Sequence, residues 1–308
     1  MTADAVLFDN GVAAAWAPKL SVLIPFYRDD AARLVASLNR KGADVEIVVL
    51  DDGSRDDALA ARIVAAVQAL SLPARFIRLA KNEGRAAGRN RLADAARAEH
   101  LLFLDADMLP DHADFLDRWL ALIEREAPAA AFGGISLAQT PKTRETAVHR
   151  AMALRSDCLP ASVRRRAPEK YVFTSNLLVR RDLFVAEPFD AGFKGWGWED
   201  VEWSMRISRR HPIVHIDNPA THLGLDPAAK MAAKFEQSAA NFARVVAAHG
   251  DIVRAYPSYR VAKALKHVPL RSIWRPLLKA AALAAPAPAT TRAFALRLYR
   301  AALYAEAV

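Results

Sequence analysis

The chain has 308 residues, of which 53% are hydrophobic and 25% charged, a balance that excludes general disorder. Its net charge is +9, yet residues 252–305 hold ten Lys or Arg residues and no Asp or Glu, so the rest of the chain is nearly neutral. No window approaches the roughly 18 to 20 uncharged apolar residues of a membrane-spanning helix, so we expect no integral membrane protein.

Predicted strands and helices alternate through the first half of the chain, after a leader to which we assign no element. Four apolar runs predict strands, at residues 20–25, 45–50, 75–79 and 101–104. Three segments between them have the apolar periodicity of helices, at residues 29–40, 60–70 and 81–98. This alternation is typical of βαβ units and predicts an α/β fold with a mostly parallel sheet.

The alternation weakens in the second half of the chain. Strands are predicted at residues 129–137, 171–179 and 213–216. Helices are predicted at residues 115–126, 145–155, from 199 and from 228, the last one broken at Pro257, Pro269, Pro276, Pro286 and Pro288. We place a domain boundary after Gly250, which gives a main domain at 1–250 and a basic helical extension at 251–308. The single cysteine, Cys158, cannot form an internal disulfide, which predicts a reducing, cytoplasmic location.

Two carboxylates follow the fourth predicted strand. The apolar run at 101–104 leads directly into Asp105 and Asp107, and an apolar run of this kind suits a parallel strand covered on both faces. Ligands of such sheets bind beyond the carboxyl ends of the strands. Carboxylates so close together repel each other unless a cation lies between them, and oxygen ligands favour Mg²⁺ or Mn²⁺. An isolated D-x-D segment would more simply be a solvated turn or a helix cap.

Polar groups also follow the first two strands of the predicted sheet. Pro25 and Tyr27 end the first strand, and Asp51 to Ser54 follow the second. Together with Asp105 and Asp107 they would converge on one edge of the sheet, which favours a nucleotide site. The segment at 81–98, before the fourth strand, adds positive charge at this edge through Lys81, Arg85 and Arg89. A solvated basic face would also account for Lys81.

These segments resemble the inverting family 2 glycosyltransferases with the GT-A fold. The resemblance spans about residues 20–225 and rests on five segments in a fixed order: 21–27, 50–56, 82–90, 103–107 and 199–200. It implies a Rossmann-like, mostly parallel sheet flanked by helices, with the basic helical C-terminal segment as an extension.

The resemblance also implies roles for the residues of the donor site. Asp52 would contact the uracil of a UDP-sugar, and Asp105 would lie near the ribose or the sugar. Asp107 would bind Mn²⁺ or Mg²⁺, and His222 matches the place of a further metal ligand in several relatives, although a lone histidine is more often structural. Arg89 would lie near the donor sugar or the phosphates.

The segment from Gly195 to Asp200 contains the residues that the resemblance assigns to the acceptor side of the site. Asp200 would be the catalytic base, with Glu199 orienting the acceptor or the loop, although acids also favour a helix N-terminus. Trp196 and Trp198 are flanked by glycines, which favours an exposed stacking surface for a sugar over a core position. The segment is similar to the W-G-x-E-D segment of galactosyl- and N-acetylgalactosaminyltransferases, which favours UDP-galactose or a UDP-N-acetylhexosamine.

The sequence departs from the family pattern in the first motif, at Phe26 and Arg28, and at Gly88, where alanine is usual. No Q-x-x-R-W follows Glu199 and Asp200, so a processive synthase is not expected. We predict a metal-dependent, inverting, non-processive transferase that acts on a glycan or a lipid-linked acceptor in polysaccharide biosynthesis at the cell envelope. The alternatives are a nucleotidyltransferase and a non-catalytic nucleotide-sugar-binding protein; no nucleic-acid-binding module is recognisable.

The C-terminal segment predicts a further partner. Apolar residues such as Ile273, Trp274 and Leu277 lie between its basic residues, a pattern typical of a helix on an anionic membrane surface. We expect peripheral attachment to the inner face of the cell membrane. A docking face for a protein, or packing against the main domain, are the alternatives.

Overall fold

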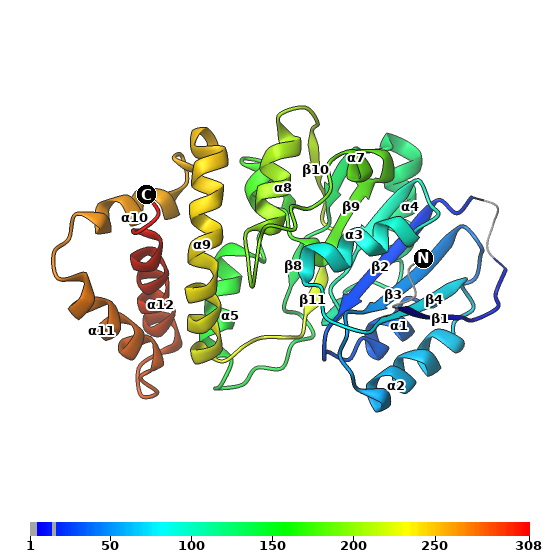
Figure 1. The fold of residues 1–308 in the computed structure, drawn as a ribbon, viewed down its shortest axis with the longest axis horizontal. Helices are drawn as coiled ribbons and strands as arrows, with labels where there is room; N and C mark the ends of the chain where they lie inside the picture. The colour runs from blue at the N-terminus through cyan, green and yellow to red at the C-terminus, as the bar shows by residue number, and fades with distance from the viewer. Residues whose placement is uncertain (1–4, 14–16) are drawn as a thin grey trace.

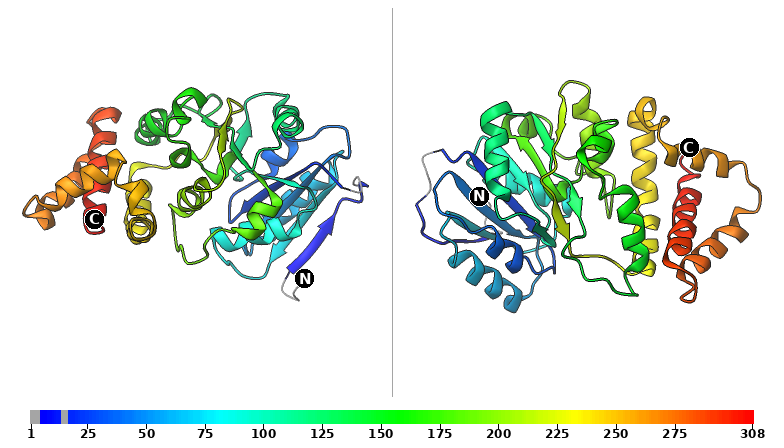
Figure 2. Two further views of the ribbon diagram at one scale, coloured as in Figure 1. Left: turned by 90° about the horizontal axis from the view of Figure 1, so that it is seen from above. Right: turned by 180° about the vertical axis from the view of Figure 1, so that it is seen from behind.

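The structure is a computed structural model that describes residues 5–13 and 17–308 (Figure 1). An α/β part and a bundle of helices lie side by side along the long axis of the molecule. The chain starts in the α/β part and ends in the bundle, and the other two views show the same arrangement (Figure 2).

Within these residues the main sheet has eight strands in the order β1-β4-β3-β2-β5-β9-β7-β10. Their bounds are β1 Ala5–Asp9, β2 Leu20–Phe26, β3 Val45–Asp51, β4 Ala74–Leu79, β5 His100–Phe103, β7 Ala130–Phe132, β9 Leu177–Arg180 and β10 Ile213–His215. Strands β4, β3, β2 and β5 are parallel, so their carboxyl ends meet at one edge of the sheet, as predicted. Strand β1 pairs antiparallel with β4, in the leader to which the sequence assigned no element.

A second, three-stranded sheet crosses the end of the first. It consists of β6 (Met108–Pro110), β11 (Ala220–His222) and β8 (Ile135–Ser136), with β11 in the middle. The register places His222 opposite Met108, the residue after Asp107. The second sheet thus brings two distant chain segments together at the carboxylate pair.

Helices cover both faces of the main sheet. In β2, Val22 and Ile24 point to a core shared with α1 (Ala32–Ser37), α2 (Asp57–Gln68) and α4 (Phe115–Glu126). Leu23 points to the other face, where α3 (Arg85–Ala95), α7 (Arg181–Ala186) and α8 (Glu199–Ser208) pack. Burying one such aliphatic side chain contributes about 1.5–3 kcal/mol, which explains why strands apolar on both faces form the centre of the domain.

The second part of the molecule consists of α5 (Ala147–Ser156), α9 (Ala228–Val253), α10 (Pro257–Lys266), α11 (Arg271–Leu283) and α12 (Ala289–Tyr304). The short helix α6 (Ala161–Arg164) instead packs against β10 of the main sheet. One apolar cluster joins α5, α9, α11 and α12, and a second joins α8, α9, α10 and α12. The boundary predicted after Gly250 falls inside α9, next to a non-helical residue at His249. No helix among the described residues is long and apolar enough to cross a membrane.

Three sequence predictions of local structure were wrong. The strand predicted at 129–137 is two strands, β7 and β8, because the chain changes sheets at Gly133 and Gly134, where a Cβ on Gly133 would collide with Asn176. The strand at 171–179 is two 3-10 turns, η1 (Pro168–Tyr171) and η2 (Thr174–Asn176), before β9, because buried Asn176 donates to the carbonyls of Gly134 and Asn218. Pro276 lies inside α11 without ending it; both Pro276 and Ser272, whose carbonyl loses its helical partner, are exposed to water.

Candidate active site

A cleft of about 570 Å³ lies at the carboxyl ends of β2, β3 and β5. Six of the residues predicted for the donor and metal sites line it: Pro25, Tyr27, Asp52, Arg89, Asp105 and Asp107. Its other walls come from the loop before α3, from residues 193–195 and from the start of α9. The predicted convergence of three strand ends is therefore present in the structure.

Asp52 organises the loop that leads into α3. Its carboxylate accepts hydrogen bonds from Asn82 Nδ2 (2.9 Å), from the Glu83 amide (2.7 Å) and from the Gly84 amide (3.0 Å). Burial raises the pKa of Asp52, and the two amide hydrogen bonds offset this only in part. The side chain therefore shapes the wall of the cleft as well as lining it.

Two arginines of α3 hold the carboxylates of the cleft. Arg89 is buried, and its Nη2 donates to Asp105 Oδ1. Arg85 Nε donates to Glu199 Oε1 (2.7 Å), while Arg85 Nη2 lies 3.7 Å from Asp105 Oδ2. Arg85 thus connects the D-x-D segment, predicted for the donor site, with the start of α8, predicted for the acceptor side.

Asp107 and His222 meet beside Gly224. His222 Nε2 lies 3.1 Å from Asp107 Oδ2, and the Leu223 amide donates to the Asp107 carbonyl (2.8 Å). Burial alone would raise the pKa of Asp107, but the hydrogen bond to His222 and the charges of His222 and Arg85 together lower it. A Cβ on Gly224 would lie 2.0 Å from Asp107 Oδ2, so only glycine leaves room for this carboxylate.

The ligand atoms of Asp107 and His222 suit a divalent metal ion that a nucleotide diphosphate would also help to hold. Among the described residues, no three His, Cys, Asp or Glu side chains form a cluster able to hold a metal alone. Mg²⁺ is commonly held by one or two carboxylates together with substrate phosphates and water. Asp107 and His222 could supply the protein part of such a set, and Gly224 keeps the space beside them open.

Glu199 and Asp200 occupy the first turn of α8, behind the lining of the cleft and not within it. Burial alone would raise the pKa of Glu199, but the charge of Arg85 lowers it. Burial raises the pKa of Asp200 to about 7, and the neighbouring charge of Glu199 adds to the effect. Of the two acids, Asp200 therefore has the pKa suited to exchange a proton near neutral pH.

Trp196 and Trp198 pack against the helical bundle and do not line the cleft. Trp196 contacts Phe235, and Trp198 stacks near Phe242 and donates from Nε1 to Tyr304 Oη (2.9 Å). Both rings are half-buried. The exposed sugar platform expected from their glycine neighbours is not the arrangement seen here, because α9 and α12 cover the rings.

The start of α9 adds residues that the sequence reasoning missed. Lys230 and Lys234 line the cleft, and Asp226 holds their ammonium groups at 2.7 and 2.5 Å. Asp29 faces them from the end of β2; burial raises its pKa, and the charge of Asp107 raises it further. The available signal was the i, i+4 spacing of Lys230 and Lys234, which places both on one face of α9, with Asp226 just before the helix.

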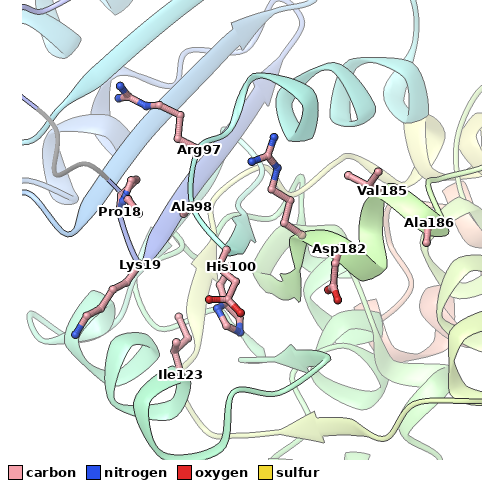
Figure 3. A pocket seen from close by; sticks show the side chains of 12 residues that line it. Pro18, Lys19, Arg97, Ala98, His100, Ile123, Asp182, Val185 and Ala186 are labelled. Atoms are coloured by element: carbon pink, nitrogen blue, oxygen red, sulfur yellow. The ribbon is translucent and has the colours of Figure 1, made fainter.

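A second hollow, of about 750 Å³, lies at the opposite ends of β2 and β5 (Figure 3). Lys19, Arg97 and Asp182 point around it, but each already pairs with another side chain, Glu124, Glu46 and Arg180 respectively. A neighbouring side chain of opposite charge therefore offsets the charge of each of these three residues.

Comparison with known proteins agrees with the geometry of the cleft. The Glycosyl transferase family 2 profile matches residues 21–186, more than half of the chain. A Bacillus subtilis (strain 168) protein described as the uncharacterized glycosyltransferase YfnE is 38% identical over 95 residues. That match covers 30% of this chain and 24% of the Bacillus protein, so the chain spans about a quarter of its length.

Solved structures share the fold at low sequence identity. The mannosyltransferase PcManGT from Pyrobaculum calidifontis, in complex with GDP-Man and Mn²⁺, superposes with a TM-score of 0.57 at 16% identity, covering 96% of this chain and 90% of that one. Residues 1–349 of S. aureus TarS, in complex with UDP, give a TM-score of 0.52 at 17% identity, covering 86% and 79%. These likenesses identify the GT-A-like fold of the α/β part.

Proposed function

Because the chain belongs to glycosyl transferase family 2 and is a glycosyltransferase, we propose that it moves one sugar from a UDP-sugar to a hydroxyl group of a glycan or a lipid-linked acceptor, with inversion and with a divalent metal ion. The observation that carries the proposal is the cleft, which gathers Tyr27, Asp52, Asp105 and Asp107 with the cations of α3 and α9. Solved relatives of this fold hold GDP-Man with Mn²⁺ in one case and UDP in another.

The donor would lie along the strand ends with its base near Asp52 and Tyr27. Tyr27 is exposed at the cleft, and the Arg28 guanidinium lies 4.9 Å from the centre of its ring, over one face. The other face of the ring would stack on the base, and Asp52 would limit the depth of the site. Arg85, Lys230 and Lys234 surround the position of the diphosphate with positive charge. Such preorganised charges stabilise the growing charge of a leaving group better than mobile water does.

Asp107 and His222 would hold the metal. When bound, Mn²⁺ or Mg²⁺ would neutralise charge on the departing diphosphate. The side chains themselves are arranged for this, since Asp107 keeps a lowered pKa and stays ionised at neutral pH. Asp105, fixed by Arg89, is left to orient the ribose or the sugar.

Asp200 would take the proton of the acceptor hydroxyl. Inversion in one displacement requires the base to stand across the sugar from the leaving group. Arg85 joins Glu199 to Asp105, which ties the α8 segment to the donor wall while Glu199 remains ionised beside it. We assign Asp200 as the base and Glu199 as the residue that positions Arg85 and the first turn of α8. The donor sugar remains UDP-galactose or a UDP-N-acetylhexosamine in this proposal.

The test measures UDP release and product formation from these donors with Mn²⁺, using wild type, Asp107→Ala, Asp200→Asn and Asp57→Ala. Asp57 is an exposed acid on α2, so its variant controls for loss of one negative charge. Asp200→Asn should reduce turnover about 10²- to 10⁴-fold and leave donor affinity unchanged. Asp107→Ala should abolish transfer and the metal-dependent binding of UDP. A product of retained anomeric configuration, or full turnover of wild type in excess EDTA, would refute the mechanism.

A further inference from the structure

Helix α11 exposes an apolar face to solvent. Leu270, Ile273 and Leu277 are 67%, 59% and 64% exposed, and they follow one another at helical spacing toward exposed Ala280 and Ala281. The opposite face is also apolar and packs inward through Leu278 and Ala282. An apolar helix face is normally buried against another surface, yet this outer face is exposed to solvent. The basic residues Arg275 and Lys279 of the same helix pair with Glu306 and Glu236.

Basic side chains are exposed on α10, the helix that precedes α11 in the chain. Arg260, Lys263 and Lys266 of α10 are exposed, and no acid occurs between residues 252 and 305. The exposed residues 266–270 connect α10 directly to α11. Both helices lie at the outer end of the bundle, away from the main sheet, in all views (Figures 1 and 2). The α/β part of this chain therefore does not cover them.

The charge pattern selects the partner that fits this surface. A second copy of the chain would bring two positively charged surfaces together, which is unfavourable at short distance. A bilayer with anionic headgroups offers negative charge at the height of the basic side chains and an apolar interior for Ile273 and Leu277. An acidic protein would match the charges but would leave open why the row of aliphatic residues continues into the small Ala280 and Ala281.

We propose that the outer face of α11, together with the basic residues of α10, docks on an anionic lipid bilayer. The surface comprises residues 260–281 and is called the docking face. The proposal deepens the proposed function, on which it rests for the idea that the acceptor is lipid-linked. Docking would bring the cleft to its acceptor by reducing a search in three dimensions to a search along the membrane.

The test is co-sedimentation of the full chain with vesicles of phosphatidylcholine alone and of phosphatidylcholine mixed with phosphatidylglycerol. Wild type should bind the anionic vesicles, and this binding should weaken as the salt concentration is raised. Ile273→Gln and Leu277→Gln should each lower the partition coefficient about tenfold, since more than half of each side chain would be buried in lipid. Arg260→Gln and Lys263→Gln should each lower it about fivefold.

The matched control is Val185→Gln on α7, an aliphatic residue that is 59% exposed but distant from the docking face. It should bind vesicles like wild type, and all variants should keep the wild-type unfolding temperature and the wild-type rate of UDP release from the UDP-sugar in solution. Three results would overturn the proposal. The first is equal binding of wild type to neutral and anionic vesicles, and the second is wild-type binding by the Ile273→Gln/Leu277→Gln double variant. The third is a wild-type dimer that this double variant abolishes. Sedimentation does not depend on turnover, so failure of docking and failure of the proposed reaction are separate results.

Discussion

Replacing Gly224 by alanine should damage the metal site while leaving the fold intact. The added Cβ would lie 2.0 Å from Asp107 Oδ2 and 2.9 Å from its Cγ, distances that no van der Waals contact allows. The atoms in the way belong to the free end of a side chain, so Asp107 can rotate aside without moving the backbone. Its carboxylate then leaves His222, from which it is 3.1 Å away in wild type.

The size of the effect follows from the contacts that are lost. A hydrogen bond to a charged group contributes about 1.5–3 kcal/mol, and alanine recovers about 0.4–1 kcal/mol by restricting the unfolded chain. We therefore expect the free energy of unfolding to fall by about 1–2 kcal/mol. Displacing one of two protein ligands should cost more, about 10- to 100-fold in metal affinity.

A Mn²⁺ titration of UDP-sugar turnover, with a parallel titration of the unfolding temperature, measures both effects. The control is Gly88→Ala in α3, which lines the same cleft but whose Cβ would meet no atom closer than 3.6 Å. Alanine in that helix should raise the free energy of unfolding by about 0.5–1 kcal/mol and leave the Mn²⁺ dependence unchanged. An unaltered Mn²⁺ titration for Gly224→Ala would refute the role of Asp107 and His222.

Three further predictions concern α8 and its supports. Asp200 faces Glu199, Arg85 and Arg89 and has a pKa raised to about 7. The proposed base therefore takes up a proton as the pH falls below about 7, and kcat/KM should fall with it. The pH–rate profile of Asp200→Asn should lack this dependence. Arg85→Gln leaves buried Glu199 without its cation and should lower the free energy of unfolding by about 1.5–3 kcal/mol in urea titrations; an unchanged value would show that solvent already screens the pair. Tyr304→Phe removes the hydroxyl that anchors the indole before α8, so kcat should fall several-fold with donor affinity unchanged in calorimetry, and an equal loss of donor affinity would indicate general misfolding.

The fold of the first half was predictable because its strands are apolar on both faces. In β2, Val22 and Ile24 enter one core and Leu23 the other, so the sequence shows a continuous run that only a covered parallel strand explains. Parallel strands share one carboxyl edge, and this geometry alone placed Tyr27, Asp52, Asp105 and Asp107 around one cleft. The wall of donor-site residues therefore followed from local pattern and sheet geometry.

The features of the fold and the site that were not predictable depend on contacts between segments far apart in the chain. The approach of Lys230 and Lys234 to the cleft requires the path of residues 223–227 across the carboxylates, which no local pattern specifies. The division of 129–137 between two sheets depends on buried Asn176, some forty residues away. The meeting of Asp107 with His222 was proposed only through resemblance, and the register of β6 with β11 supplies its physical cause.

The loop before α8, residues 194–198, shows why the C-terminal helices belong with the α/β part. Asn241 of α9 donates to the carbonyls of Lys194 and Gly197, and Tyr304 of α12 bonds both Trp198 and Ser238. Trp198 has a φ of 79°, a left-handed conformation that a bulky residue adopts only when its surroundings hold it. The conformation that starts α8, and with it the position of Asp200, therefore depends on helices on both sides of the boundary predicted at Gly250. A segment read from its charge as an extension is thus also a support of the proposed base.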